Sequence, residues 1–413
     1  MKIVIIGGGA AGMMAACTAA QKGAEVILIE RNTQLGIKVN ITGKGRCNVT
    51  NDSEPEALIK NTLTNGRFLY SAFATFSAQD TMAFFEKIGV PLKVERGKRV
   101  FPVSDHARDI TGALKTHLHR LGVTVLQHRV KGIVTENNVV TGVSLQDGTV
   151  SQADRVILAT GGRSYPRTGS DGDGYRMAQA LGHTVTALRP SLVPLLTEET
   201  TPAQMEGLAL KNVSLTIQKD GKKIFSDFGE MVFTAKGISG PLVLSASAHL
   251  GVKKHTYPYQ AFIDLKPALD HDTLDKRLLR DFAENSNRDF SNALSQLLPA
   301  KMIPVMVELC GISPRQKVNV ITRAQRENLC KLLKAFPFTV VAAGSWDEAV
   351  VTAGGITVKE IDPKTMASKL VSGLYFAGEV MDVDAYTGGF NLQIAWSTGY
   401  CAGQAAAEGE ETL

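Results

Sequence analysis

The first residues in the chain that could do chemistry are glycines at a fixed spacing. Gly7-x-Gly9-x-x-Gly12 follows a run of β-branched residues, and Glu30 stands 18 positions after Gly12. Gly7 would make a tight turn, Gly9 would let the backbone approach a pyrophosphate, and Gly12 would let a helix pack closely on a strand. The N–H groups at the start of that helix attract phosphate, and Glu30 can accept a hydrogen bond from a ribose hydroxyl. The pattern predicts dinucleotide binding.

Further glycines follow later predicted strands. Ala159-Thr160-Gly161-Gly162 ends one strand, and residues 374–377 lead into Gly378-Glu379. Small residues at the carboxyl ends of a parallel sheet leave room for a long ligand. A separate pyridine-nucleotide domain would need a second strand–GxGxxG–helix pattern, and Gly169-x-x-Gly172-x-Gly174 has a different spacing. The pattern therefore favours one long dinucleotide.

Gly388 and Gly389 precede the last predicted helix. The N–H groups at that helix start could face the edge of a flavin ring that becomes negative on reduction, and would stabilise the anion by about 1–2 kcal/mol. The alternative interpretation is an ordinary helix start in an α/β domain.

Cys47, Tyr165 and Tyr386 are the candidate catalytic residues, as proton donors. A hydride delivered to one end of a polarised C=C bond must be matched by a proton at the other end. A lone cysteine is more often a small buried hydrophobic residue, and the neighbouring Arg46 would favour its thiolate, which argues against an acid role. The sequence leaves this choice open.

Metal and disulfide chemistry find little support. Asp171 and Asp173 lack the spacing of a calcium loop, and the eight histidines show no paired ligand spacing. The five cysteines are scattered, without a Cys-x-x-Cys pair. We predict no metal site.

Composition and charge narrow the protein class. The chain has 413 residues, of which 44% are hydrophobic and 21% charged, which is typical of a globular protein with two or three domains. It has no long apolar run and no signal-peptide pattern, so we expect a cytoplasmic protein outside the membrane. The net charge is only +5, but seven cations and two glutamates occupy residues 301–334. A second basic cluster comprises Lys93, Arg96, Lys98 and Arg99. Such clusters are either solvated faces or binding sites for a polyanion.

These residues must be positioned by the predicted elements. Residues 2–6, 10–22 and 25–29 read as strand, helix and strand, which is one βαβ unit. Residues 191–265 alternate apolar and polar, and residues 268–335 are helical with proline breaks. We expect an α/β fold in which a discontinuous Rossmann-like domain (1–190 and 355–413) carries a β-rich, barrel-like domain (191–266 and 336–354) and a small helical domain (267–335).

Longer motifs make the chain resemble a known family. They are GGGAAG at 7–12 with Glu30, ITGKGRCNVTN at 41–51, ATGGRSYPRTGSDGDGYRMAQALGH at 159–183, FTAKGISGP at 233–241 and VTAGGITVKEIDPKTMASKLVSGLYFAGEVMDVDAYTGGFNLQIAWSTGYCAG at 351–403. The chain is similar to bacterial FAD-dependent oxidoreductases called HI-type or BaiN-like flavoproteins, within the glutathione-reductase/fumarate-reductase class. The resemblance spans essentially the full length. Ala235 departs from it, because members often carry histidine there, and any role of that histidine is absent or supplied otherwise.

The resemblance implies an FAD site, residue by residue. The ADP half would involve Gly7, Gly9, Ala11, Gly12, Glu30, Arg31, Lys38, Val130, Thr160 and Gly161. Thr42, Gly43, Arg46, Cys47 and Asn48 would approach the flavin, and Gly378 and Glu379 would hold the ribityl–phosphate stretch. The residues under the isoalloxazine would be Gly388, Gly389, Phe390, Asn391 and Gln393.

Several functions remain open at this point. The resemblance implies FAD-dependent reduction of an activated C=C bond with NAD(P)H as a transient electron donor. Our first hypothesis for the substrate is uridine in ribosomal RNA, reduced to dihydrouridine, because the basic residues 301–334 could dock a large anion. The alternatives are a small steroid-like enone, an amine oxidised with O2, or a flavin-loaded RNA-binding or redox-sensing protein without turnover. The oligomeric state is left open.

Overall fold

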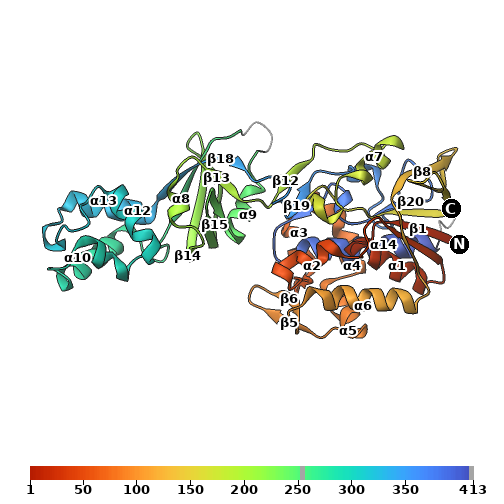
Figure 1. Ribbon diagram of the computed structural model, residues 1–413, viewed down its shortest axis with the longest axis horizontal. Coiled ribbons are helices and arrows are strands. Elements are labelled where there is room, and N and C mark those ends of the chain that lie inside the picture. Colours follow the sequence, from red (N-terminus) through yellow and green to blue (C-terminus); the bar gives the residue numbers. More distant parts are fainter. Residues whose placement is uncertain (252–255, 409–413) are drawn as a thin grey trace. The chain divides into compact units, whose positions relative to one another are not determined.

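The computed structural model describes residues 1–251 and 256–408. Contacts divide them into two compact units, which are described separately. Unit 1 comprises residues 1–191 together with the described residues from 346 onward, and unit 2 comprises Leu192–Ser345. Figure 1 follows the chain through the helices and strands of both units.

Unit 1 is built around a five-stranded sheet in the order β20-β11-β1-β2-β7. All neighbouring strands in it are parallel. The strands are β1 (Lys2–Ile6), β2 (Glu25–Glu30), β7 (Thr124–Gln127), β11 (Arg155–Leu158) and β20 (Leu374–Phe376). Their nearly continuous apolar runs are typical of parallel strands that are covered on both faces.

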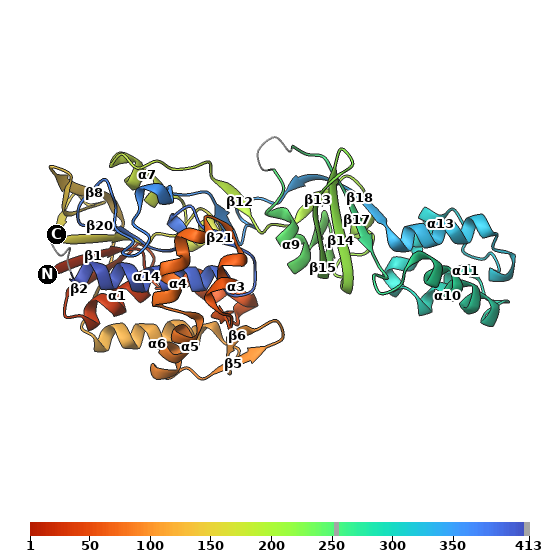
Figure 2. The same ribbon diagram turned by 180° about the vertical axis from the view of Figure 1, so that it is seen from behind.

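Three helices cover one face of this sheet, and a small antiparallel sheet lies on the other. The helices are α1 (Ala10–Gln21), α6 (Ala107–Arg120) and α14 (Phe390–Glu408), which lie below the sheet in Figure 2. The small sheet is formed by β8 (Val130–Glu136), β9 (Val139–Leu145) and β10 (Val150–Gln152). A turn at Asp147-Gly148 joins β9 to β10, and Gly148 has the positive φ, 89°, that such a turn requires.

Helices α1 and α14 pack directly on each other through small residues. A Cβ atom on Gly399 would lie 2.5 Å from the carbonyl oxygen of Ala11, and one on Gly403 would lie 2.5 Å from that of Ala15. Both pairs advance by four residues in the same direction, so the two helices are parallel. At a rise of 1.5 Å per residue, α14 therefore begins about 12 Å before the level at which α1 begins.

The remaining elements of unit 1 form short helices and small sheets around this centre. The other helices are α2 (Ile37–Ile41), α3 (Pro55–Lys60), α4 (Tyr70–Thr75), α5 (Ala78–Lys87) and α7 (Asp173–Ala180). The 3-10 turns are Thr42–Gly45, Gly66–Leu69, Pro166–Thr168, Val358–Glu360 and Gly378–Val380. The small sheets are β3 (Thr50–Asn51) with β6 (Arg99–Pro102) and β5 (Leu92–Glu95), β4 (Thr62–Thr64) with β21 (Asp384–Ala385), and β12 (Arg189–Ser191) with β19 (Val351–Ala353).

Unit 2 contains a closed six-stranded barrel in the order β13-β16-β15-β14-β17-β18. Its strands are β13 (Leu195–Thr197), β14 (Ala209–Lys219), β15 (Lys222–Thr234), β16 (Gly237–Ser239), β17 (Tyr259–Asp264) and β18 (Phe336–Ala343), with helices α8 (Thr201–Gln204) and α9 (Pro241–Ser247). Closure leaves no unpaired sheet edge.

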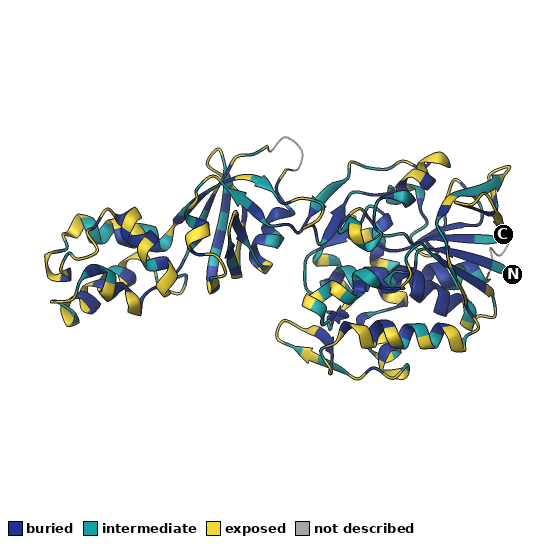
Figure 3. Cartoon of the chain, viewed as in Figure 1, coloured by how far each residue is buried: buried dark blue, intermediate teal, exposed yellow. Residues whose placement is uncertain are grey.

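A helical segment follows β17 and precedes β18. It comprises α10 (His271–Glu284), α11 (Phe290–Ala293), α12 (Ile303–Cys310) and α13 (Arg323–Lys334), with 3-10 turns at Leu294–Gln296, Ala300–Met302 and Val318–Val320. Barrel and helices share one hydrophobic core, which the buried residues in Figure 3 trace. The predicted fold class is confirmed, with a discontinuous Rossmann-like domain, an inserted barrel and a helical region. No helix among the described residues has the length and apolar character needed to cross a membrane.

Candidate functional site

The glycine turn after β1 provides open space at the start of α1. Gly7 has φ 105°, and a Cβ atom there would lie 2.6 Å from the carbonyl oxygen of Ala159 on the neighbouring strand. A Cβ atom on Gly12 would collide with the backbone of Gly7, so Gly12 serves close helix–strand packing. At Gly9, by contrast, a Cβ atom would meet nothing within 4 Å. The space that a phosphate group needs therefore lies in front of Gly9.

Glu30 joins this turn to the end of β2. Its Oε2 accepts a hydrogen bond from the backbone N–H of Gly8 at 2.7 Å, and its Oε1 accepts from the backbone and side-chain nitrogens of Asn32, each at 2.8 Å. A carboxylate has about four acceptor positions. One position therefore remains open, where Glu30 could accept from the predicted ribose hydroxyl.

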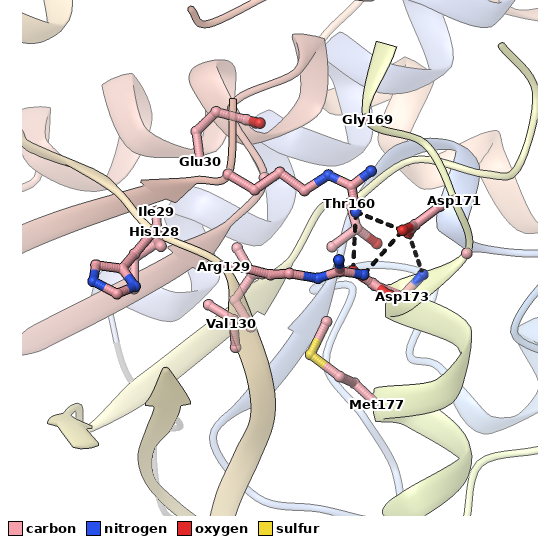
Figure 4. A pocket seen from close by; sticks show the side chains of 14 residues that line it. Ile29, Glu30, His128, Arg129, Val130, Thr160, Gly169, Asp171, Asp173 and Met177 are labelled. Atoms are coloured by element: carbon pink, nitrogen blue, oxygen red, sulfur yellow. Dashed lines mark hydrogen bonds and ion pairs between the residues drawn. The ribbon is translucent and has the colours of Figure 1, made fainter. Parts of the chain in front are cut away.

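A pocket opens beside Glu30 at the ends of β1 and β2. Its lining includes Ile29, Glu30, Val130, Thr160 and Met177. Figure 4 shows Glu30 and the strand that carries Val130 on opposite sides of the opening. The pocket combines apolar side chains with charged ones, including Arg31, Arg129, Asp171 and Asp173. Apolar walls with a few polar groups suit the adenosine part of a dinucleotide.

Ion pairs fasten the loop before α7 across this pocket. Arg31 Nη1 lies 2.6 Å from Asp171 and 3.1 Å from Asp173, and Arg129 Nη2 lies 3.0 Å and 2.5 Å from the same two carboxylates. Figure 4 shows Arg129 reaching towards both aspartates. Arg129 was not predicted, and Asp171 and Asp173 were considered only as candidate metal ligands, which their spacing disfavoured. Arg129 could have been suspected from the sequence, because it precedes the predicted cofactor residue Val130, just as Arg31 follows the predicted cofactor residue Glu30.

Lys38 and Glu379, predicted at separate parts of the cofactor, form one partly buried cluster. Lys38 Nζ donates to Glu379 Oε2 at 2.8 Å and to Ser164 Oγ at 2.6 Å. Glu379 Oε1 accepts from the N–H of Thr352 at 2.7 Å and from Ser164 Oγ at 2.9 Å. Burial alone would raise the pKa of Glu379, but the charge and hydrogen bond of Lys38 and the two further donors hold it below its usual value. Glu379 is therefore ionised at neutral pH.

Gly378 places this cluster beside the start of α1. It has φ 75°, and a Cβ atom there would lie 2.8 Å from the Cβ of Ala11. Its N–H donates to Thr398 Oγ1 on α14 at 2.9 Å. The predicted phosphate and ribityl residues thus adjoin each other.

The second and last motifs of the sequence meet at the start of α14. Gly389, with φ 99°, presses against the backbone of Thr50, so no side chain fits there. Asn51 Nδ2 donates to the carbonyl oxygen of Gly388 at 3.0 Å, and Thr50 Oγ1 donates to Gln393 Oε1 at 2.5 Å. These contacts hold the predicted flavin residues of both motifs in one place.

The amide side chains at this helix start are already engaged by the protein. Asn391 accepts from the N–H of Ala385 at 2.9 Å and donates to the carbonyl oxygens of Ala385 and Tyr386 at 2.7 and 3.1 Å. Gln393 donates to the carbonyl oxygen of Phe76 at 3.2 Å. These side chains shape the loop at 385–389, and the start of α14, where Phe390 is buried, would offer a flavin its backbone N–H groups.

Arg46 is neutralised by two carboxylates. Its guanidinium donates to Asp105 at 2.8 Å and to Glu95 at 2.5 Å, and it stacks 4.1 Å from the centre of the Phe101 ring. Burial raises the pKa of the adjacent Cys47 to about 12, although a hydrogen bond with Thr42 lowers it. The expectation that Arg46 would favour a thiolate is therefore wrong, because burial outweighs a charge that is already balanced. Cys47 is a thiol with 0% of its surface exposed.

The two candidate tyrosines lie in turns next to the site. Tyr165, with φ 51°, precedes the 3-10 turn Pro166–Thr168, and its N–H donates to the carbonyl oxygen of Trp346 at 3.1 Å. The N–H of Tyr386 donates to the carbonyl oxygen of Asn61 at 3.0 Å, two residues before Gly388. Both side chains are partly exposed.

Unsatisfied polar atoms test whether these residues fit FAD. Asn48 Oδ1 and Thr160 Oγ1 are buried without a hydrogen-bond partner in the part of the chain that the structure describes. Buried polar atoms almost always have partners, so each indicates a missing polar group. Gly43, with φ 57°, and Gly161, with φ 72°, lie in the same two loops. With the space at Gly9 and two parallel helix starts offset by about 12 Å along the helix axis, these residues fit a ligand with a pyrophosphate at one point and a flavin further along.

The chain is similar to proteins with known activities. It is 33% identical to the 3-dehydro-bile acid delta(4,6)-reductase of Clostridium scindens, over 98% of this chain and 99% of that protein. It is 31% identical to the ribosomal RNA dihydrouridine synthase of Haemophilus influenzae, over 97% of each. The 3-ketosteroid-delta4-(5alpha)-dehydrogenase of Rhodococcus jostii RHA1 has a similar fold, with a TM-score of 0.54 at 17% identity over 98% of this chain and 96% of that one.

The match to a family spans almost the whole chain. Residues 1–405 match the family described as HI0933-like protein Rossmann domain. The resemblance inferred from the motifs is thereby confirmed. The chain belongs to this HI0933-like family and is an FAD-dependent oxidoreductase.

Proposed function

We propose that this flavoenzyme reduces a ring C=C bond conjugated to a carbonyl group, with NAD(P)H as the electron donor. The observation that supports this is common to the two relatives named above. A bile acid delta(4,6)-reductase and a dihydrouridine synthase both add two hydrogens across a ring double bond that a carbonyl group polarises. Because the identities of 33% and 31% extend over nearly the full chain, we extend that reaction class to this protein.

The chain's own residues would provide charge stabilisation and a proton. Bound FAD would supply the hydride for one carbon of the double bond. The other carbon then needs a proton from the protein. Backbone N–H groups at the start of α14 would stabilise negative charge on the cofactor, since a helix start carries a partial positive charge.

Tyr386 is our first choice for the proton donor. Asn391 holds the carbonyl oxygen of Tyr386 at 3.1 Å, directly before the loop that presses on Thr50, and the tyrosine side chain is partly exposed. Tyr165 is the second choice. Cys47 is the third, because its enclosed thiol, with a pKa of about 12, would need an opening to reach a substrate. Tyr386→Phe should lower the rate of substrate reduction about 100-fold or more while the flavin spectrum stays unchanged. If only Tyr165→Phe has that effect, the order of the first two is reversed.

Two substrates carry such a bond, and we place uridine in ribosomal RNA first. The basic residues 301–334 give this less support than their sequence suggested. Four of their seven cations are paired with carboxylates, namely Lys317, Arg323, Arg326 and Lys334. The support comes from the name of the Haemophilus relative and from a different basic surface, described in the next subsection. A steroid-like enone is the second candidate, favoured by the Clostridium relative.

The deciding experiment has a cellular and a purified arm. Deletion of the gene should remove a dihydrouridine from ribosomal RNA, and the purified holoenzyme should oxidise NAD(P)H when unmodified ribosomal RNA is added. Oxidation with 4-androstene-3,17-dione but not with RNA would support the enone instead. Consumption of O2 with an amine, and no NAD(P)H oxidation with either acceptor, would refute the reductase proposal.

A further inference from the structure

The turn of the β5–β6 hairpin carries a group of cations without acidic partners. We call residues 96–99 the hairpin tip. Arg96, Lys98 and Arg99 are exposed, and none of them forms an ion pair with any residue in the ranges 1–251 and 256–408. The guanidinium of Arg99 donates only to the carbonyl oxygen of Arg96, at 3.0 Å. Three positive charges are therefore available to an external anion.

At the base of the same hairpin, the cations are paired with carboxylates. Lys93 lies 2.7 Å from Asp105, and Arg46 is bound by Glu95 and Asp105. Glu95 and Asp105 are thus used by cations other than those of the tip. The pKa values of Glu95 and Asp105 are lowered by these hydrogen bonds, so both remain ionised and paired at neutral pH.

One buried amide connects the hairpin tip to the start of α14. Asn51, with 4% of its surface exposed, donates from Nδ2 to the carbonyl oxygen of Gly97 and to that of Gly388, each at 3.0 Å. In addition, the N–H of Asp52 donates to the carbonyl oxygen of Lys98 at 2.8 Å. The hairpin tip is therefore held next to the glycine loop at which we place the flavin ring.

The basic residues 301–334 show that a cluster in the sequence need not be a free charge. Besides the four ion-paired cations, Lys301 donates to the carbonyl oxygen of Glu206 at 2.7 Å. The hairpin tip has fewer cations than this segment, but none of them is ion-paired among the described residues, and Arg99 donates only to the carbonyl oxygen of Arg96 within the tip itself. Exposed and unpaired cations are the groups that neutralise phosphates in nucleic-acid binding.

We propose that the hairpin tip binds the phosphate backbone of an RNA substrate and so holds the target uridine at the start of α14. This rests on the proposed function. A base inside a helix must leave the stack to reach a catalytic ring, and contacts to the flanking phosphates position the strand while it does so. Arg96 and Arg99 can each bind a phosphate with two parallel hydrogen bonds, whereas Lys98 contributes a single charge.

The test compares two charge-matched variants of the full-length holoenzyme. One carries Arg96→Gln, Lys98→Gln and Arg99→Gln, and the other carries Lys301→Gln, Arg315→Gln and Lys331→Gln. The probes are a fluorescein-labelled 16-nucleotide oligouridylate and an unmodified ribosomal RNA transcript, whose binding is followed by anisotropy over a range of salt concentrations. Each variant must retain bound FAD with an unchanged absorption spectrum. A variant that has lost its fold is recognised by this criterion, independently of RNA binding.

The hairpin-tip variant should bind both RNA probes at least 10-fold more weakly than the wild type. Each lost phosphate contact lowers the slope of log K against log salt by about 0.7 on a single strand, so the slope should fall by about 2. The control variant should change by less than about 2-fold, because the charge it removes does not belong to the hairpin tip. Equal losses in both variants, or an unchanged slope in the hairpin-tip variant, would overturn the proposal.

A small-molecule assay distinguishes RNA binding at the hairpin tip from binding of a small acidic substrate there. The product of the wild-type reaction with RNA tests the proposed function separately. If the hairpin tip served a small acidic substrate, its variant would raise KM for a steroid enone carboxylate but leave KM for neutral 4-androstene-3,17-dione and RNA affinity unchanged, and the proposal would fail. If RNA affinity falls as expected but no dihydrouridine is formed by the wild type, the docking surface stands and the proposed reaction fails.

Discussion

The two glycine-led helix starts of unit 1 look alike in sequence but differ in what their glycines face. At α1, the position of a Cβ atom on Gly9 is empty out to 4 Å. At α14, the corresponding position on Gly389 is occupied by the backbone of Thr50. The first glycine therefore makes room for a ligand, and the second makes room for the protein chain. A substitution at the glycine before α1 should therefore change ligand affinity without changing stability. A substitution at the glycine before α14 should change both.

The side chains at the two starts follow the same division. Glu30 uses three hydrogen bonds to shape the turn before α1 and keeps an acceptor position for a ligand. Asn391 and Gln393 use their amide groups to hold loop and helix together. If FAD binds as proposed, the family motifs mark residues that would touch the cofactor at one end and residues that would build its floor at the other.

The largest effect should come from Gly389→Ala. Its φ of 99° is unfavourable for alanine, and the added Cβ would overlap the backbone of Thr50. We expect the free energy of unfolding of the apoprotein to fall by about 3 kcal/mol, with loss of FAD binding. Urea denaturation of apoprotein and holoprotein measures both. A variant with the wild-type midpoint would remove the proposed distinction between the two helix starts.

Gly9→Ala should weaken FAD binding without lowering the stability of the protein, whereas Gly389→Ala should lower both. The added Cβ meets no protein atom, so the stability of the apoprotein should change by less than about 0.5 kcal/mol. The dissociation constant for FAD should rise about 30-fold, or about 2 kcal/mol, because the methyl group occupies the phosphate space. Flavin fluorescence titration of the apoprotein measures this. FAD binding as tight as in the wild type would show that phosphate does not approach Gly9.

Gly399→Ala tests the contact that couples the two helix starts. Its Cβ would lie 2.5 Å from the carbonyl oxygen of Ala11, so α1 and α14 must move apart. We expect a loss of about 1.5 kcal/mol in stability together with weaker FAD binding. Ala405→Gly, on the same helix, is the control for a change of one methyl group. A stability loss without any change in FAD affinity would mean that the spacing of the helices does not set the cofactor site.

Arg129→Gln should weaken FAD binding about 5-fold, or about 1 kcal/mol, because these partly exposed ion pairs hold the loop before α7 over the pocket. Since salt screens such pairs, the difference from the wild type should shrink at high ionic strength. Lys131→Gln, at an exposed position two residues along from Arg129, is the matched control. An equal effect of both variants would point to general charge instead of the ion pairs.

The smallest effect should be a pH dependence of opposite sign at two carboxyl groups. Burial raises the pKa of Asp384 above its ordinary 3.8, against the opposing effects of Thr64 and Arg189. Its ionised form therefore costs stability above the folded-state pKa, and this cost disappears as the pH falls below 3.8. Asp384→Asn should stabilise the protein at pH 7 and do so less at pH 4.

Glu379 provides the contrast, because its pKa is lowered from 4.5. Its contribution to stability is complete above pH 4.5 and is lost as the pH falls from there through the folded-state pKa. The Glu379→Gln variant should therefore be less stable than the wild type at pH 7, and this deficit should narrow below pH 4.5. Thermal unfolding at several pH values measures both variants. A constant difference from the wild type across this range would refute the assignment for either residue.

Much of the fold could be predicted because its signals are local. The apolar run of β1, the glycine turn and the alanine-rich α1 are read within about 20 residues. The turn at Asp147-Gly148 and the hairpin between β14 and β15 depend on a few neighbouring residues each. The inserted barrel could be predicted because the sequence changes from continuous apolar runs to alternating apolar and polar residues at 191–265.

What could not be predicted depends on partners far apart in the chain. Arg129 meets Asp173 across 44 residues, and Lys38 meets Glu379 across 341. Arg46 is neutralised by Glu95, whereas Arg96 has no acidic partner among the residues that the structure describes, and neither fact can be read from the order of charges.

The sequence by itself determined the family, the FAD cofactor and the parallel sheet with its glycine turns, because these depend on residue types at short, regular spacings. Only the tertiary structure decided which glycine faces a ligand, which cations are free and which thiol is enclosed. Those properties arise from what lies within a few ångströms in space, where segments that are hundreds of residues apart pack together and exclude water.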